Sequence, residues 1–266
     1  MTTAEYKRKL NEVYANFYGT DTPQCKYCEE TRKKFANKCK YSFDRAKVGG
    51  QYGEDPRIPR IMMVGLESKH ADKQDYIIQE IETPSRSASN AHYRGARYVL
   101  AYLLSTFYRM DTPKSTSSAN LHDYEFMTEK YVLTNLYKCA FGEPNQVRNL
   151  FHFDDMRRYC QELFFAEIEA AEPDVVVIQA VNNHPENFWA NILERFSDGK
   201  ENCLIGDGKY NRTSAYRMRL SSGQPFLMIF TYHGAWPPFA GKRYLSTLNT
   251  ILDAAIAELK ERFCID

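Results

Sequence analysis

Short apolar runs of strand length alternate with longer amphipathic stretches along most of this chain. No other feature limits its fold as much. Strands are predicted at residues 61–64, 131–138, 174–180 and 226–232, and helices at 93–108, 154–171 and 243–262. Strands that alternate with helices form a mostly parallel sheet covered by helices on both faces. The sites of such α/β proteins lie beyond the carboxyl ends of the strands.

The rest of the chain fits one domain. Apolar residues at helical spacing predict a peripheral helix at 4–17, and the polar stretches 111–120 and 198–214 are predicted to be loops. We expect a single domain over 1–266, with a helical, cysteine-bearing segment at about 1–47. The 266 residues include 43% hydrophobic ones, which is enough for a core.

Charge and hydropathy limit where in the cell this protein is expected and what it is expected to bind. The chain contains no apolar run of about 18 residues, so no membrane span is predicted. Its first residues lack the apolar stretch of a signal peptide. The net charge of +1 does not favour polyanion binding by the protein as a whole. We expect a cytoplasmic monomer that does not associate with membranes.

Seven cysteines stand out in a chain without a secretion signal. In that setting cysteines favour thiolates that bind metal over a disulfide scaffold. Cys25 and Cys28 are separated by two residues, and thiolate ligands select an iron–sulfur cluster or zinc over harder metals. Cys203 and Cys264 are interpreted as non-ligands. An iron–sulfur cluster, a zinc ion and simple buried thiols all remain open from this pattern.

Polar and chemically capable residues follow each predicted strand. These segments are Gly65-Leu-Glu-Ser68, Thr134-Asn-Leu-Tyr-Lys-Cys139, Gln179-Ala-Val-Asn-Asn183 and Thr231-Tyr-His-Gly-Ala-Trp-Pro237. Parallel strands end at a common edge of their sheet, so the four segments are expected to converge there.

The order of these segments resembles that of the uracil-DNA glycosylase superfamily, and most closely its iron–sulfur members. The resemblance covers about nine-tenths of the chain. Its elements are Cys25-x-x-Cys28, Met63-Val-Gly65, Leu133-Thr-Asn-Leu-Tyr-Lys-Cys139, Cys160 before Glu172-Pro-Asp-Val, and Tyr232-His233. The resemblance implies a three-layer α/β/α sandwich around a central, mostly parallel four-stranded sheet. It also implies hydrolysis of the N-glycosidic bond of uracil, or of a related damaged base, in DNA.

The resemblance also implies a ligand set for a [4Fe–4S] cluster. It favours four cysteines as ligands, with Cys39 as a replacement for one of the first pair, and zinc remains the alternative metal. The four favoured ligands are Cys25, Cys28, Cys139 and Cys160.

Base recognition is assigned to the first two motifs by the resemblance. Asn135 stands where the family reads uracil, since its amide donates to one uracil oxygen and accepts from the ring N–H. Tyr93 matches an aromatic residue that stacks on the flipped base. Gly65 and Leu66 begin the first catalytic motif, beside the base.

Catalysis is assigned to Glu67 and His233. A carboxylate at Glu67 orients the attacking water or stabilises the oxocarbenium-like sugar, and a neutral His233 donates to O2 of the departing uracil. Gly234 and Trp236 belong to the loop that probes the minor groove. Basic residues that could contact phosphates are Lys33, Lys34, Arg94, Arg97, Lys242 and Arg243.

Two alternatives remain open. Ser68 replaces the family's Pro after the carboxylate, and Lys69 follows it, so the first motif departs from the family pattern. A protein of the same fold that binds nucleic acid without turnover is therefore the second hypothesis. An unrelated zinc-bound α/β protein is the third.

Overall fold

The computed structural model describes residues 1–18, 45–67, 91–117, 120–137, 154–179, 186–197, 203–206, 213–233, 239 and 241–265. The helices are α1 (Thr3–Tyr18), α3 (Ala91–Ser105), η2 (Thr106–Tyr108), η3 (His122–Lys130), α5 (Asp154–Ala171), α6 (Glu186–Phe196) and α7 (Lys242–Phe263). The strands are β1 (Lys47–Val48), β2 (Ile61–Glu67), β3 (Tyr131–Tyr137), β4 (Val175–Gln179), β5 (Cys203–Ile205), β6 (Ser214–Arg219) and β7 (Pro225–Thr231).

All strands of the described chain belong to one sheet, in the order β1-β3-β2-β4-β7-β6-β5. The neighbours β3, β2, β4 and β7 are parallel to one another, whereas β1, β6 and β5 pair antiparallel at the two sides. The predicted α/β class is confirmed. The predicted strands form the parallel centre, but the sheet has seven strands, so a four-stranded sheet was wrong. β1 and β5, of 2 and 3 residues, are too short to show a period in sequence.

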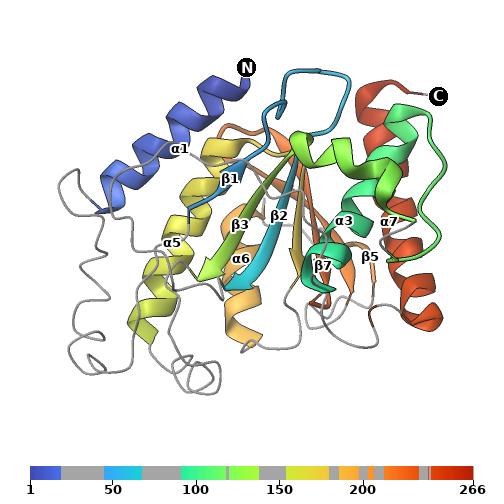
Figure 1. Ribbon diagram of the computed structural model, residues 1–266. Helices are drawn as coiled ribbons and strands as arrows, with labels where there is room; N and C mark the ends of the chain where they lie inside the picture. Colours follow the sequence, from blue (N-terminus) through green and yellow to red (C-terminus); the bar gives the residue numbers. More distant parts are fainter. Residues whose placement is uncertain are drawn as a thin grey trace.

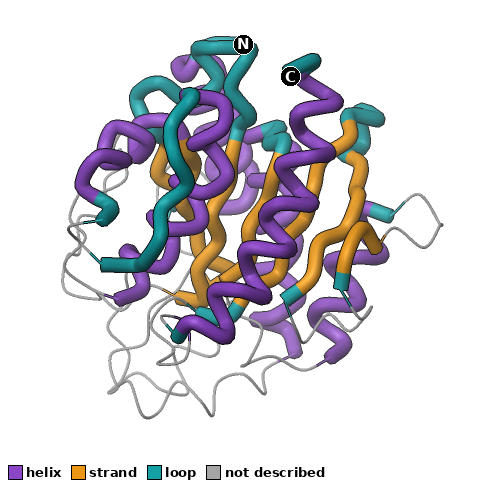
Figure 2. The backbone as a smooth tube through the Cα atoms, turned by 90° about the vertical axis from the view of Figure 1, so that its right-hand side faces the viewer, coloured by secondary structure: helices purple, strands orange, loops and turns teal. Residues whose placement is uncertain are grey.

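Helices cover both faces of the sheet (Figure 1). On one face, α1, α5 and α6 pack against Met62, Val64 and their neighbours, and on the other α3 and α7 pack against Ile61 and Met63. Figure 1 shows α1 and α5 at the left of the sheet and α3 and α7 at the right, and Figure 2 shows α7 crossing in front of the strands. Residues that alternate along each strand therefore serve two separate cores. We call them the α5 face and the α7 face.

The helix predicted at 4–17 is α1, and its apolar stripe is buried on the α5 face. Tyr6, Leu10 and Tyr14 are at most 2% exposed. The hydroxyl of Tyr14 donates to Glu167 Oε1 (2.6 Å) and accepts from the backbone N–H of Ala46 (2.7 Å). Thr134 on β3 donates to the second carboxyl oxygen of Glu167 (2.9 Å). This buried network joins α1, α5 and β3.

The amino ends of the strands are held by an ion pair. Arg60, just before β2, donates from Nε and Nη2 to the two carboxyl oxygens of Asp174, just before β4 (2.9 and 3.0 Å). Asp174 also accepts from the backbone N–H of Arg60 (2.8 Å), and Arg60 donates to Tyr6 Oη (2.7 Å). These bonds fix the β2–β4 pair at the edge opposite the predicted site. Among the described helices, none has the length and apolar character needed to cross a membrane.

Candidate functional site

The register of the parallel strands places four predicted strand-end residues in one row. Gly65 pairs with Asn135 across β2 and β3, and Gln179 pairs with Thr231 across β4 and β7. Val64 pairs with Ile178, so Gly65 and Gln179 occupy the next position of the same pair of strands. The row therefore reads Asn135, Gly65, Gln179, Thr231 at the carboxyl edge of the sheet.

Every member of this row lies on the α7 face. Leu133, Met63, Val177 and Ile229, each two residues earlier on its strand, belong to the core beneath α3 and α7. Side chains two apart on a strand share a face. In agreement, Thr134 points to the other face, where it bonds Glu167. Asn135 and Gln179 thus present their amides to the same side of the sheet.

The spacing within the row matches the size of a small planar ligand. Neighbouring strands lie about 4.8 Å apart, so the backbones at Asn135 and Gln179 are separated by about 10 Å with Gly65 between them. Glycine adds no side chain to that gap. His233 follows the row two residues after Thr231 and is half-buried.

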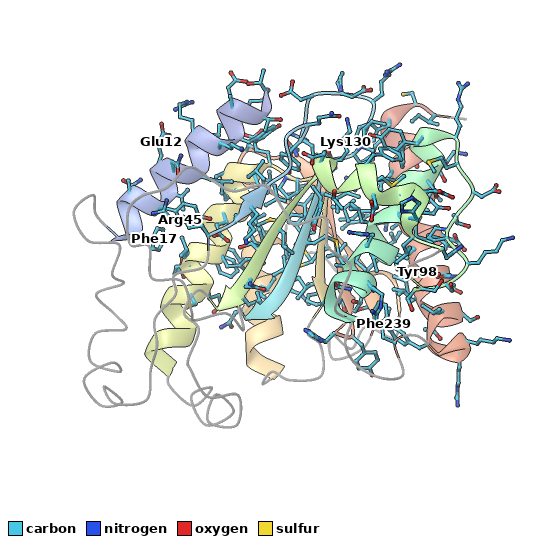
Figure 3. The ribbon with its side chains drawn as sticks, in the orientation of Figure 1. Glu12, Phe17, Arg45, Tyr98, Lys130 and Phe239 are labelled. Carbon is cyan, nitrogen blue, oxygen red and sulfur yellow. The ribbon has the colours of Figure 1, made fainter. Side chains whose placement is uncertain are left out.

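The segment that leads to His233 is anchored by Tyr244, in the first turn of α7. The backbone N–H of Tyr232 donates to Tyr244 Oη (3.0 Å), which also shares a hydrogen bond with Thr213 Oγ1 (3.0 Å). The rings of Tyr232 and Phe239 pack on the Tyr244 ring at 5.2 and 5.3 Å. Burial raises the pKa of Tyr244 to about 12, so its hydroxyl stays protonated at neutral pH. In Figure 3 Phe239 lies at the end of the sheet where the strand arrows end.

Gln179 was not assigned a role from the sequence. It is 1% exposed, and its Nε2 has no hydrogen-bond partner among the residues that the structure describes. The only sequence signal for it is its position, as the first polar residue after the apolar run Val175-Val-Val-Ile178.

Some predicted site residues are described only in part. Leu66 and Glu67 end β2, with Glu67 in register with Tyr137, and Tyr93 lies in the first turn of α3. The side chains of these three residues are outside the description. Lys242 and Arg243 are exposed in the first turn of α7.

Other predicted residues fall outside the described residues altogether. They are Gly234, Trp236, Lys33, Lys34, Cys25, Cys28, Cys39 and Cys139. Cys160 is the one proposed ligand in the described part of the chain, where it is buried on the α5 face. No group of three or more His, Cys, Asp or Glu side chains that could hold a metal occurs within the described ranges.

Arg97, one of the basic residues that could contact phosphates, is buried instead of solvated. Arg97 is 5% exposed and donates to Glu125 (3.2 Å), so it stabilises the packing of α3 on η3. Helical spacing alone could not separate this buried arginine from exposed ones such as Arg243.

A shallow surface hollow between α1, α5 and α6 is lined by Phe17, Phe165 and charged side chains. It lies over the α5 face, away from the row of strand-end residues, and brings together none of the predicted site residues.

Comparisons with protein-family models and with curated proteins find no match to this chain.

Proposed function

We propose that this protein is a DNA glycosylase that hydrolyses the N-glycosidic bond of uracil, or of a related damaged base, in DNA. The proposal includes a domain of the glycosylase-like three-layer α/β/α type. The supporting observation is the row at the carboxyl edge, where Asn135, Gly65 and the strand leading to His233 share one edge, and Asn135, Gly65 and Thr231 share the α7 face.

Recognition in this proposal begins with an extruded base. Taking a base out of the stack costs a few kcal/mol, and the pocket must recover that cost with specific contacts. Asn135 donates its amide N–H to O4 and accepts the ring N–H of uracil, a pattern that cytosine does not offer. The ring of Tyr93 stacks on the extruded base.

Bond cleavage is assigned to Glu67 and His233. Glu67 orients a water whose oxygen attacks the sugar carbon C1′ and accepts the proton that the water loses. The bond from C1′ to the base nitrogen breaks, and its electron pair passes to the base, where the negative charge spreads to O2. His233 donates a hydrogen bond to that oxygen, and one such preorganised donor contributes about 3–4 kcal/mol to the barrier reduction.

The proposed [4Fe–4S] cluster is held by Cys25, Cys28, Cys139 and Cys160, with Cys39 as the alternative ligand and zinc as the alternative metal. Cys160 is the proposed ligand that lies in the described part of the chain, and its side chain is buried. Cys160 belongs to the α5 face, whereas Asn135 faces α7. A cluster at Cys160 therefore lies across the sheet from the pocket, and we assign it a structural role.

DNA is the proposed partner. Lys242 and Arg243 are exposed in the first turn of α7, where Tyr244 binds the backbone of Tyr232, and they contact phosphates in this proposal. Gly234 and Trp236 enter the minor groove. The proposed assembly is a cytoplasmic monomer.

The test is strand scission of a uracil-containing oligonucleotide by protein followed by alkali, with a thymine-containing oligonucleotide as the substrate control. Glu67→Gln and His233→Ala should remove most scission and leave the gel shift intact. His122→Ala is the matched control, because His122 is 76% exposed on η3 and should not affect the rate. A gel shift without scission by the wild type would instead support the binding protein suggested by Ser68. Absence of both would refute the family assignment.

A further inference from the structure

Among the residues that the structure describes, Nε2 of Gln179 is a buried donor at the carboxyl edge that makes no hydrogen bond. Its side chain is 1% exposed, and its Nε2 meets no acceptor in the part of the chain that is described. A buried donor without a partner destabilises a fold, and such groups are rare in native proteins. A ligand that supplies an acceptor would resolve the conflict.

The position of Gln179 indicates where that acceptor lies. Gln179 and Asn135 flank Gly65 in one register row and on one face. Two hydrogen bonds of about 2.9 Å and one planar ring fit in a gap of about 10 Å. Two amides that flank a glycine on one face therefore form a frame for a single flat ring that carries more than one polar group.

We propose that Gln179 is a second amide of the base pocket, and that its Nε2 donates a hydrogen bond to O2 of the extruded pyrimidine. This inference rests on the proposed function and deepens it, because it adds a 2-oxo group to the substrate features that are read. β4 lies on the β7 side of Gly65, away from Asn135. Once Asn135 holds O4 and the ring N–H, the remaining carbonyl is O2.

The same oxygen receives the hydrogen bond from His233. Negative charge develops on O2 as the glycosidic bond breaks, so both bonds become stronger in the transition state than in the bound substrate. Gln179 should therefore affect kcat more than KM. Cytosine also carries O2, so discrimination against cytosine stays with Asn135, and Gln179 selects for the oxygen itself.

The experiment compares wild type with Gln179→Leu and Gln179→Met on oligonucleotides that carry deoxyuridine or 2-thiodeoxyuridine. Sulfur is the weaker acceptor. Both variants should lower kcat on uracil by on the order of 100-fold. They should lose less on 2-thiouracil, because two changes to one contact are not additive. The melting temperature of the free variants should not fall, since the lost Nε2 donor has no described partner.

Gln224→Leu is the matched control. Gln224 donates from Nε2 to the carbonyl oxygens of Glu172 (3.2 Å) and Pro173 (3.4 Å), at the opposite edge of the sheet. This variant should melt at a lower temperature and keep its wild-type kcat and its wild-type preference for uracil.

The following results would overturn the assignment of Gln179 to the base pocket. A wild type that excises uracil, with both Gln179 variants at wild-type kcat, refutes the role of Gln179 alone. Equal losses on the two substrates together with a lower melting temperature, or failure of both variants to fold, would show that the amide is structural. A wild type that neither binds nor cleaves the uracil oligonucleotide refutes the proposed function and this inference together.

Discussion

Substitution of Tyr14 by phenylalanine tests the buried network around Glu167. The carboxyl group of Glu167 is 0% exposed, in the core between α1, α5 and β3. Tyr14→Phe keeps the ring in place and removes one hydroxyl. The removal deprives Glu167 Oε1 of a donor at 2.6 Å and the Ala46 N–H of an acceptor at 2.7 Å.

The expected loss follows from those two bonds. A hydrogen bond to a charged group contributes about 1.5–3 kcal/mol, and a buried N–H left without a partner costs about 1–3 kcal/mol. We expect the free energy of unfolding to fall by about 3–5 kcal/mol. For a chain of this size about 3 kcal/mol corresponds to a decrease in melting temperature of about 6–12 °C.

Urea unfolding followed by circular dichroism measures the change, with Tyr108→Phe as the matched control. The hydroxyl of Tyr108 is buried but has no partner within the described residues, so its removal should leave stability unchanged or increase it. Thr134→Val, which removes the bond to the other oxygen of Glu167, should not be additive with Tyr14→Phe. Equal effects of the two tyrosine substitutions would refute the argument that the network, and not the ring, stabilises this core.

Three further predictions concern the site, the pH dependence and the metal. Tyr244→Phe removes the acceptor for the Tyr232 N–H; it should lower kcat for uracil several-fold at unchanged KM, and a change confined to urea stability would contradict this. Burial raises the pKa of Tyr244 to about 12 from the ordinary value of about 10. The contribution of this protonated hydroxyl to the free energy of unfolding is therefore complete below pH 10 and is lost as the pH rises toward 12. The loss should be about 1 kcal/mol at pH 11, where Tyr244→Phe should show a smaller pH dependence than wild type. Purified protein should absorb broadly near 400 nm and contain about four irons per chain, whereas one zinc in a colourless protein would contradict the cluster.

The parallel centre of the sheet could be predicted because its strands are continuous apolar runs. Val175-Val-Val-Ile178 and Phe226-Leu-Met-Ile-Phe230 are buried on both faces, which removes the polar alternation and leaves a short run of uniform hydropathy. The helices α5 and α7 were predicted to within one residue at each end. Their apolar residues recur at the 3.6-residue period over several turns.

The antiparallel part of the sheet could not be predicted in the same way. β6 reads Ser-Ala-Tyr-Arg-Met-Arg, with exposed arginines between buried residues, and it begins inside a polar stretch that was predicted to be a loop. Its place in the sheet is set by six register pairs with β7. A local pattern does not contain that information.

The convergence of strand-end residues at one edge could be predicted, but the contacts that support them could not. Asn135 was assigned from the resemblance of Leu133-Thr-Asn-Leu-Tyr-Lys-Cys139 to the family motif, and the register shows that it lies beside Gly65. Burial of Gln179 and Arg97 depends on how α3 and β4 pack, so their residue types alone gave no indication. Nor could Tyr244 be linked to the segment before His233, since 11 positions separate it from His233 in sequence.

Consecutive residues of the strand β3 face the two opposite sides of the sheet. Thr134 bonds Glu167 on the α5 face, and Asn135 stands in the row on the α7 face. A shift of β3 by one residue would exchange the faces, burying the amide of Asn135 in the α5 core and removing a donor from Glu167. Both consequences oppose the shift, because burying an amide and removing a hydrogen bond from a buried carboxyl group both cost free energy. The Glu167–Thr134 bond therefore does more than stabilise the core: it selects the register in which Asn135 faces the proposed pocket.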